Sequence, residues 1–372
     1  KEKDVPPEVA SLEYISDLVA AVPVTVNVAS YAQIVKDKAL LRQIIKVNQA
    51  AESLFITPGT DVRPLLLTGS EEYAAFTGGC LYLTLSLSSH SCGASVTRVD
   101  DIDVFLLEQE SDNGELRSMA LAARELREPL TNVMITADSL FPLCATEESP
   151  RTAEQVARLN RGLFQILRII GNMSDAERCA AVSHQETADI PALFAEFFEK
   201  AEALVSHTGI TLTYEGPDQP VYGLADREQL ERAVLNILSN AIKFTPKGGT
   251  VTAKLTRSGR MLRLSVTDSG SGIAQNVRSS VFSRYLRQPV LEDSRYGIGL
   301  GMVLIRTAAA HHGGAVLIDQ PEGVGTRITM TMSIRQSKQA TLRSNVLRVD
   351  YAGERDHGLI ELSECLPTEL YE

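Results

Sequence analysis

The chain has 372 residues, of which 44% are hydrophobic, and carries a formal net charge of −11. This length is sufficient for two or three domains that each bury a core. No apolar run approaches the roughly 18 residues that a membrane span requires, and an acidic chain lacks the basic surface of a general nucleic-acid binder. The five cysteines are scattered and include no C-x-x-C pair. This pattern indicates reduced thiols rather than a disulfide framework or a metal site.

Residues 1–110 are expected to form a mixed α/β domain. Residues 37–55 have helical spacing of apolar side chains, and in residues 81–87 leucines alternate with polar residues, as in a half-buried strand. Residues 96–99 and 102–107 are expected to be two further strands. Helices followed by antiparallel strands resemble a PAS-type sensor domain, although no specific binding motif accompanies the resemblance.

Residues 111–185 carry two heptad seams separated by a break that contains Pro142 and Pro150. The apolar residues of the first seam are Leu116, Met119, Ala123, Leu126, Leu130, Val133, Ala137 and Leu140; those of the second are Val156, Leu159, Leu163, Ile166, Ile170 and Met173. This spacing predicts an antiparallel helical hairpin. Since one hairpin cannot cover its own apolar stripe, a homodimeric four-helix bundle is expected. An intrachain coiled-coil linker is the alternative.

Five short segments follow in one order. They are Asn236–Phe244 (NILSNAIKF), Asp268–Gly272 (DSGSG), Val281-Phe282, Gly297–Gly301 (GIGLG) and Gly323–Thr326 (GVGT). One glycine-rich run alone would indicate only a turn. The ordered set resembles the N, G1, F, G2 and G3 boxes of the histidine-kinase ATPase domain, the Bergerat fold shared with gyrase and heat-shock chaperones. We therefore expect residues 186–335 to form an α/β sandwich that binds ATP.

Apolar patterning places the elements of this sandwich. Strands are expected near 210–214, 250–256, 261–267, 315–319 and 326–334, and helices near 189–206, 226–243 and 300–312. The whole chain is thus expected to be a multidomain α+β protein.

The resemblance implies a role for each box. Asn240, with Asn236 one turn earlier on the same helix face, would offer its amide oxygen to Mg²⁺ beside the triphosphate. Lys243 would point at phosphate, and Phe244 would pack near the nucleotide. Asp268 would accept a hydrogen bond from the adenine amino group.

The glycines would allow close backbone approach to the nucleotide. The residues implied here are Gly270, Gly272, Gly297, Gly299, Gly301 and Gly325, with Thr326 and Phe282 beside them. The segment between the F and G2 boxes is expected to be a short polar lid. Its arginines Arg284, Arg287 and Arg295 are candidates for reaching the γ-phosphate.

Asn236 separates two enzymatic branches of the resembled fold. Gyrase and the chaperones carry a glutamate there, which acts as the general base on water. An amide cannot accept a proton at neutral pH. The residue therefore disfavours ATP hydrolysis as the main activity and indicates the kinase branch.

The segment Arg124–Leu130 (RELREPL) resembles the phospho-acceptor box of sensor histidine kinases of two-component systems. Arg124 occupies the place of the acceptor histidine, and a guanidinium that stays protonated cannot act as the nucleophile. Glu125 matches the acid that assists the histidine. Glu128 stands where the family's phosphatase activity uses Thr or Asn. None of the six histidines of the chain lies in either predicted bundle helix.

Residues 336–372 form an acidic extension that the resembled family does not require. A short amphipathic helix over 359–366 and a solvated tail are both compatible with its sequence.

These features favour a degenerate histidine kinase, a homodimer through residues 111–185 that binds Mg-ATP but cannot phosphorylate itself. Its partner would be a response regulator or a complete histidine kinase. A kinase acting on a partner in trans and a slow ATPase switch are the alternatives. Without a signal sequence or membrane span, we expect a cytoplasmic protein or a fragment cut below its anchor.

Overall fold

The computed structural model divides the chain into two compact units, Lys1–Val62 and Arg63–Glu372. It describes residues 73, 76–86, 91–99, 102–107, 112–140, 150–181, 185–273, 282, 300–321, 325–335 and 355–371, all within the second unit. The predicted helix at 37–55, the lid arginines Arg284, Arg287 and Arg295, and the glycines Gly297 and Gly299 lie outside these residues.

An eight-stranded sheet runs through this unit in the order β3-β2-β1-β9-β10-β8-β7-β5. Its strands are β1 (Cys80–Ser86), β2 (Ser91–Val99), β3 (Ile102–Leu107), β5 (Thr211–Glu215), β7 (Thr250–Ser258), β8 (Met261–Asp268), β9 (Val316–Asp319) and β10 (Arg327–Ser333). The neighbouring strands are antiparallel except for β5 and β7, which are parallel. Side chains along β7 alternate between buried and exposed, as a sheet with one covered face requires.

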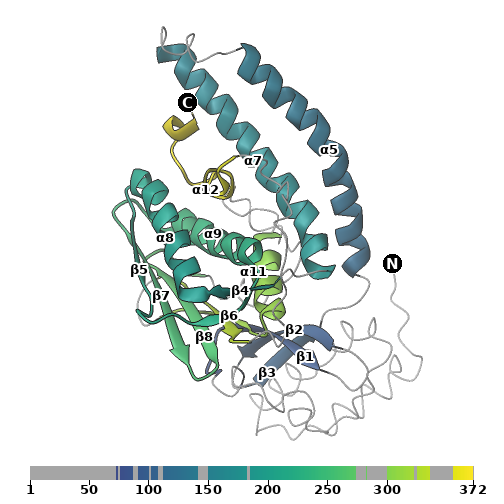
Figure 1. Cartoon of the computed structure of the whole chain (residues 1–372), viewed down its shortest axis with the longest axis vertical. Helices are drawn as coiled ribbons and strands as arrows, with labels where there is room; N and C mark the ends of the chain where they lie inside the picture. The colour runs from purple at the N-terminus through teal and green to yellow at the C-terminus, as the bar shows by residue number, and fades with distance from the viewer. Residues whose placement is uncertain are drawn as a thin grey trace, which may run out of the picture. The chain divides into compact units, whose positions relative to one another are not determined.

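Three helices cover the buried face of the part of the sheet that is formed by β10, β8, β7 and β5 (Figure 1). They are α8 (Ile190–Val205), α9 (Arg227–Phe244) and α11 (Leu300–His311). Phenylalanines of α8 and leucines and isoleucines of α9 form one core with β7, β8 and β10. The strands and helices predicted for 186–335 are therefore confirmed to within two residues at each end.

The sequence did not predict a second, two-stranded sheet. Strand β4 (Glu186–Asp189) pairs with β6 (Tyr222–Ala225) beside α8. Each strand has four residues, too few for a clear alternation of polar and apolar side chains.

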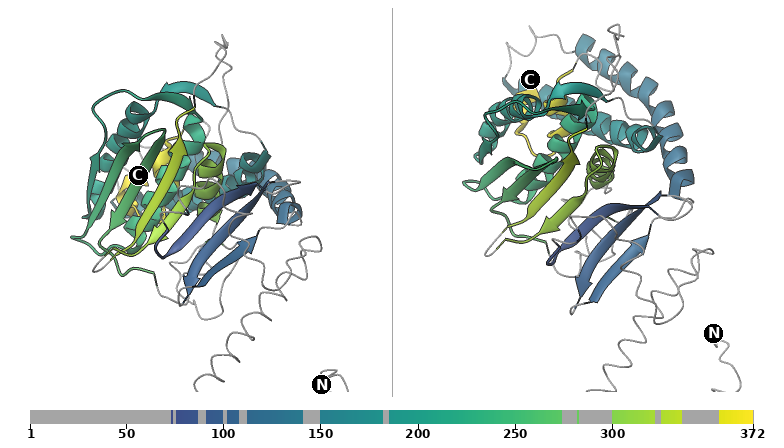
Figure 2. Two further views of the ribbon diagram at one scale, coloured as in Figure 1. Left: turned by 90° about the horizontal axis from the view of Figure 1, so that it is seen from below. Right: turned by 60° about the horizontal axis from the view of Figure 1, so that its bottom comes forward.

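The strands predicted at 81–87 and 102–107 are confirmed, whereas the strand predicted at 96–99 begins five residues earlier, at Ser91. All three continue the large sheet. β1 pairs with β9 through Cys80–Ile318 and Tyr82–Val316, so the sheet passes from β3 to the ATPase-like part without interruption (Figure 2). Because much of residues 1–110 lies outside the described residues, a PAS-like domain there stays a prediction.

The predicted hairpin consists of α5 (Asp112–Leu140) and α7 (Pro150–Ala181), with Pro129 inside α5. Ala123, Leu130 and Ala137 of α5 pack with Leu163 and Ile170 of α7 in one buried cluster. Four other seam members are on the surface: Leu126 is 50% exposed, Val133 51%, Leu159 40% and Ile166 47%. Val156 is buried, and Met119 and Met173 pack against another buried cluster. Each seam is thus only partly buried within the described part of the chain.

The C-terminal residues 355–371 are folded, so a solvated tail is the wrong alternative for this segment. Helix α12 (His357–Glu361) and the 3-10 helix η2 (Thr368–Tyr371) lie against α7, and α12 also contacts α9 (Figure 1). Leu362 and Leu366 are fully buried. The helix ends five residues before the predicted boundary at Leu366.

None of the helices in the described part of the chain is both long and apolar enough to cross a membrane.

Candidate functional site

Helix α9, which carries the N box, is hydrogen-bonded through its N-cap residue to His312, the residue that follows α11. Asp226 is its N-cap and accepts a hydrogen bond from the Gln229 backbone N–H at 3.2 Å. The Asp226 N–H in turn donates to His312 Nε2 at 3.0 Å, and His312 Nδ1 donates to the Ala308 carbonyl at 2.7 Å. His312 is 1% exposed, and this burial lowers the pKa of its imidazole below the ordinary value of 6.5. The neutral ring therefore links the start of α9 to the end of α11.

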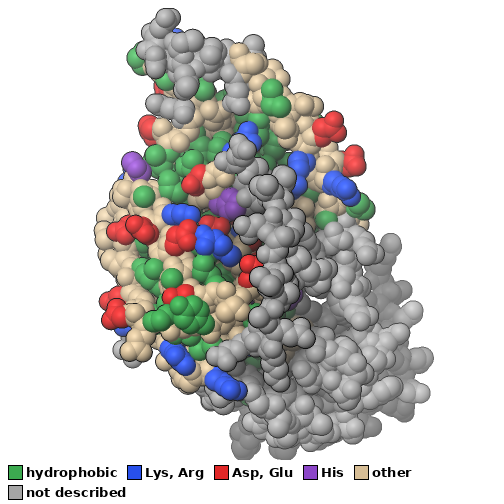
Figure 3. All heavy atoms as spheres, viewed as in Figure 1, with side chains coloured by type: hydrophobic (Ala, Val, Ile, Leu, Met, Phe, Trp, Pro, Cys, Tyr) green, Lys and Arg blue, Asp and Glu red, His purple; other side chains and the backbone are tan. Residues whose placement is uncertain are grey.

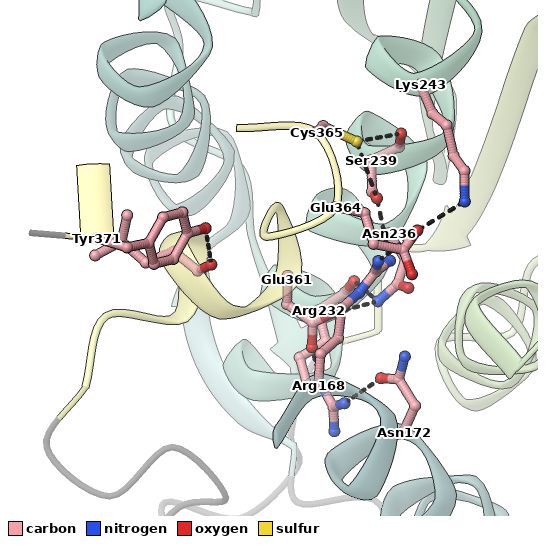
Figure 4. Close-up of polar contacts among 11 residues, drawn as sticks. Arg168, Asn172, Arg232, Asn236, Ser239, Lys243, Glu361, Glu364, Cys365 and Tyr371 are labelled. Carbon is pink, nitrogen blue, oxygen red and sulfur yellow. Dashed lines mark hydrogen bonds and ion pairs between the residues drawn. The ribbon is translucent and has the colours of Figure 1, made fainter. Parts of the chain in front are cut away.

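Asn236 lies in the interior between α9, α11 and the C-terminal segment. Its Nδ2 donates to the Arg232 carbonyl at 2.9 Å and to Glu361 Oε2 at 3.3 Å (Figure 4). Its Oδ1 is buried and has no hydrogen-bond partner among the described residues. A Cβ on Gly301, in the first turn of α11, would lie 2.6 Å from this oxygen, so the N box and the G2 box are in contact here.

Three further residues of the N box, Asn240, Lys243 and Phe244, are more accessible than Asn236. Asn240, one turn after Asn236, is half-buried, and no hydrogen bond joins its side chain to another residue in the described ranges. Lys243 Nζ lies 2.7 Å from Glu364 Oε2 of the C-terminal segment. Phe244, the last residue of α9, is half-buried.

Asp268 ends β8 and anchors the G1 box. Its Oδ1 accepts hydrogen bonds from the Gly270 N–H at 2.8 Å and the Thr326 N–H at 3.1 Å. Burial raises the pKa of the carboxyl group, and the two backbone donors partly offset this. Neither bond uses Oδ2, which has no partner within the described residues. One oxygen is therefore held by the backbone and the other is available to a ligand.

Two glycines permit this arrangement. A Cβ on Gly270 would lie 2.4 Å from the Phe244 carbonyl oxygen, which brings the G1 turn directly against the end of α9. Gly325 has a φ of +114° and a Cβ there would lie 1.9 Å from the Asp268 carbonyl oxygen. The N, G1 and G3 boxes thus converge where α9 and β8 end.

The F-box residue Phe282 is placed in the core rather than at an open site. It is 3% exposed, its ring lies 5.7 Å from that of Tyr82, and Arg306 Nη1 donates to its carbonyl at 3.1 Å. Gly272 has a φ of +73° and lies near Gln320 Nε2.

Sequence reasoning missed four charged residues next to the N box. Glu361 Oε2 lies 3.3 Å from Arg168 Nε of α7, and Glu361 Oε1 lies 3.2 Å from Arg232 Nε of α9. Glu364 pairs with Lys243 and with Arg168 Nη1 at 3.2 Å (Figure 4). More than 100 residues separate each glutamate from its partners, so no local pattern could have indicated these pairs.

The segment Arg124–Leu130, which resembles a phospho-acceptor box, lies on α5. Arg124 and Glu125 are exposed, and no hydrogen bond or ion pair joins either side chain to another residue of the described part. The structure therefore does not bring them together with the N, G1 and G3 boxes.

Comparison with known proteins shows similarity to one ATPase family and to several sensor kinases. The family of histidine kinase-, DNA gyrase B-, and HSP90-like ATPases matches residues 225–336. An uncharacterized sensor-like histidine kinase of Rhizobium meliloti is 29% identical over 276 residues, covering 70% of this chain and 52% of that protein. The signal transduction histidine-protein kinase/phosphatase MprB of Mycobacterium sp. is 28% identical over 302 residues, covering 80% of this chain and 53% of that protein.

The adaptive-response sensory kinase SasA of Synechocystis sp. is 29% identical over 224 residues, or 58% of each chain. The chain thus spans between 52% and 58% of the length of these three relatives. Among solved structures, full-length ShkA in complex with AMPPNP gives a TM-score of 0.49 at 23% identity, covering 59% of this chain and 46% of that one.

Residues 225–336 therefore form an ATPase domain of the histidine kinase, gyrase B and HSP90 type. The chain that carries this domain is a homologue of sensor histidine kinases.

The burial of His312 predicts a loss of stability in mild acid. Because its folded pKa lies below 6.5, the neutral form stabilises the fold at neutral pH, and this contribution is lost as pH falls below 6.5. The free energy of unfolding, measured by urea denaturation between pH 7.5 and 5.5, should decrease. His312→Gln should reduce the dependence of the free energy of unfolding on pH. His207→Gln, at an exposed position, should leave that dependence unaltered. An equal slope in wild type and His312→Gln would contradict the assignment.

Proposed function

We propose that the chain is a dimeric signalling protein of the sensor histidine kinase class that binds Mg-ATP and does not phosphorylate its own α5 helix. The carboxylate of Asp268 carries the proposal. Its Oδ1 is fixed by two backbone N–H groups, while Oδ2 is left to accept a hydrogen bond from an adenine amino group. A carboxylate accepts but does not donate, so it selects an amino group at that place in the base.

The N box fits the other end of such a nucleotide. The amide oxygen of Asn240 would be a neutral Mg²⁺ ligand, which is sufficient when phosphates supply most of the negative charge. Lys243, three residues further on, would bind phosphate. Bound Mg-ATP would supply an electrophilic γ-phosphoryl group, and the chain's own residues would hold and orient it.

Two residues restrict the chemistry that is available to a bound nucleotide. Asn236 cannot act as a general base on water, and its Nδ2 already donates to Glu361, which disfavours hydrolysis. Arg124 lacks the imidazole nitrogen that phosphotransfer to α5 would need. The chain would then act as a nucleotide-binding partner of a complete histidine kinase or a response regulator.

The exposed part of the heptad seams supports a homodimer. Leu126 and Val133 are seven residues apart and so lie on one face of α5, while Leu159 and Ile166 have the same relation on α7. Figure 3 shows hydrophobic side chains interspersed with charged ones along this hairpin. A second hairpin would cover the stripe and complete a four-helix bundle.

Nucleotide binding should depend on Asp268 and Asn240. Asp268→Asn places an amide where a carboxylate oxygen is needed and should weaken Mg-ATP binding by about 1–3 kcal/mol, the cost of a mispaired polar group. Asn240→Ala should weaken it in the presence of Mg²⁺. Calorimetry on both variants measures the effect, with Asp218→Asn, an exposed aspartate of the same domain, as the control. Unchanged affinity in both site variants would contradict an ATP site here.

The dimer should depend on the exposed stripe. Leu126→Lys combined with Val133→Lys would place charges in the interface, which is costly without partners, and should give a monomer by light scattering at tens of micromolar protein. Ile135→Lys changes a residue that is 59% exposed on another face of α5 and should leave the dimer intact. A wild-type protein that is itself monomeric at that concentration would refute the bundle.

The protein should take no phosphate from ATP on α5. Incubation with γ-labelled ATP should give no acid-labile, base-stable label, and phosphohistidine on the native chain would refute the degenerate assignment. In Arg124→His, transfer also requires the ATP domain to reach α5, because a misplacement of about 1 Å costs on the order of a hundredfold in rate. Any label gained there should be absent from Arg127→His, which places an imidazole one turn away on the same helix.

A further inference from the structure

The C-terminal segment Arg355–Tyr371, called here the strap, is built into two separate parts of the fold. Ile360 belongs to the buried cluster of the α5–α7 hairpin, whereas Leu362, Leu366 and Tyr371 belong to the core of the ATPase domain. All four side chains are at most 4% exposed. The strap therefore joins the hairpin to the domain rather than covering either one alone.

Polar contacts fasten the strap along α7. Arg161 donates from Nε to the Ser363 carbonyl at 3.0 Å and from Nη2 to the Glu364 carbonyl at 3.1 Å. Asn160 Nδ2 donates to the Tyr371 carbonyl at 2.9 Å, and the rings of Phe164 and Tyr371 meet edge to face at 5.2 Å. Backbone carbonyls of the strap are thus bound by two successive side chains of α7.

On its other side the strap places two carboxylates on the N box. Glu361 is fully buried and accepts from Arg168, Arg232 and the Asn236 amide (Figure 4). Glu364 lies 2.7 Å from Lys243 Nζ, the cation that the proposed function assigns to phosphate. Burial raises the pKa of Glu364, but the charges of Arg168 and Lys243 lower it below its ordinary value, so the group is ionised at neutral pH.

We infer that the strap is an autoinhibitory element, in which Glu364 occupies Lys243 and the segment holds the ATPase domain on α7. This inference rests on the proposed ATP site. A triphosphate and the Glu364 carboxylate are both anions that pair with the same ammonium group, so each repels the other there. A second carboxylate, Glu361, adds negative charge beside Asn236. Nucleotide binding would therefore oppose strap docking, and release of the strap would free the domain to move away from α7.

Single substitutions within the strap test the competition. Glu364→Gln removes the negative charge that pairs with Lys243. In the presence of Mg²⁺ it should tighten binding of a fluorescent ATP analogue by about three- to tenfold, the scale of one partly buried ion pair. Glu369→Gln makes the same change on the same segment at an exposed position and should leave the affinity as in wild type. Circular dichroism melts establish that each variant is folded.

The possible outcomes distinguish failure of the strap inference from failure of the proposed ATP site. Affinity in Glu364→Gln that is equal to wild type or weaker, together with weaker binding in Asp268→Asn, would overturn the strap and retain the ATP site. Absence of binding in every variant would overturn both.

A second measurement uses the unmodified protein. Amide hydrogen exchange in residues 357–371 should accelerate when the Mg-bound ATP analogue is added, because docking and nucleotide binding oppose each other. Exchange that stays constant or slows on binding would overturn the inference even if Glu364→Gln fails to fold.

Discussion

The described unit depends most on the carboxylate of Glu361. It is fully buried between the guanidinium groups of Arg168 on α7 and Arg232 on α9, and it also accepts from Asn236. Removing one member of such a group leaves an uncompensated charge in the interior, which typically costs about 3–5 kcal/mol. The three charges therefore stabilise one another, and they hold the hairpin, the N-box helix and the C-terminal segment together in the arrangement observed here.

Helix α9 is central to that arrangement because its residues serve both the fold and the candidate site. Its first turn is held by Asp226 and His312, its middle contributes Arg232 and Asn236 to the buried charges, and its last turn presents Lys243. A shift of this helix would disturb all of these contacts at once. Such coupling is what a protein needs if occupation of the nucleotide site is to be felt at the hairpin.

The hairpin itself divides its apolar residues between two uses. Ala123, Leu130 and Ala137 are buried where α5 meets α7, whereas Leu126 and Val133 remain on the surface. The proposed dimer assigns these exposed side chains to an interaction surface. On the same helix Arg124 is solvent-exposed, and the proposed function assigns this residue to the place of the phospho-acceptor. Under that proposal the helix would associate with a second copy but would lack the nucleophile.

The sequence by itself determined the elements of the ATPase domain, because their apolar periods are local: the alternation in 261–268 and the helical spacing in 227–244 each require only neighbouring residues. The ordered boxes likewise indicated Asn240, Lys243 and Asp268. Only the tertiary structure decided that β1 extends the sheet at β9, that part of the heptad seam stays open, and that Glu361 and Glu364 reach the N box. The sheet extension and the two glutamate contacts depend on residues more than 100 positions apart, and the open part of the seam depends on how two separate helices pack. No local pattern of hydrophobicity or charge specifies which distant partner a side chain will meet.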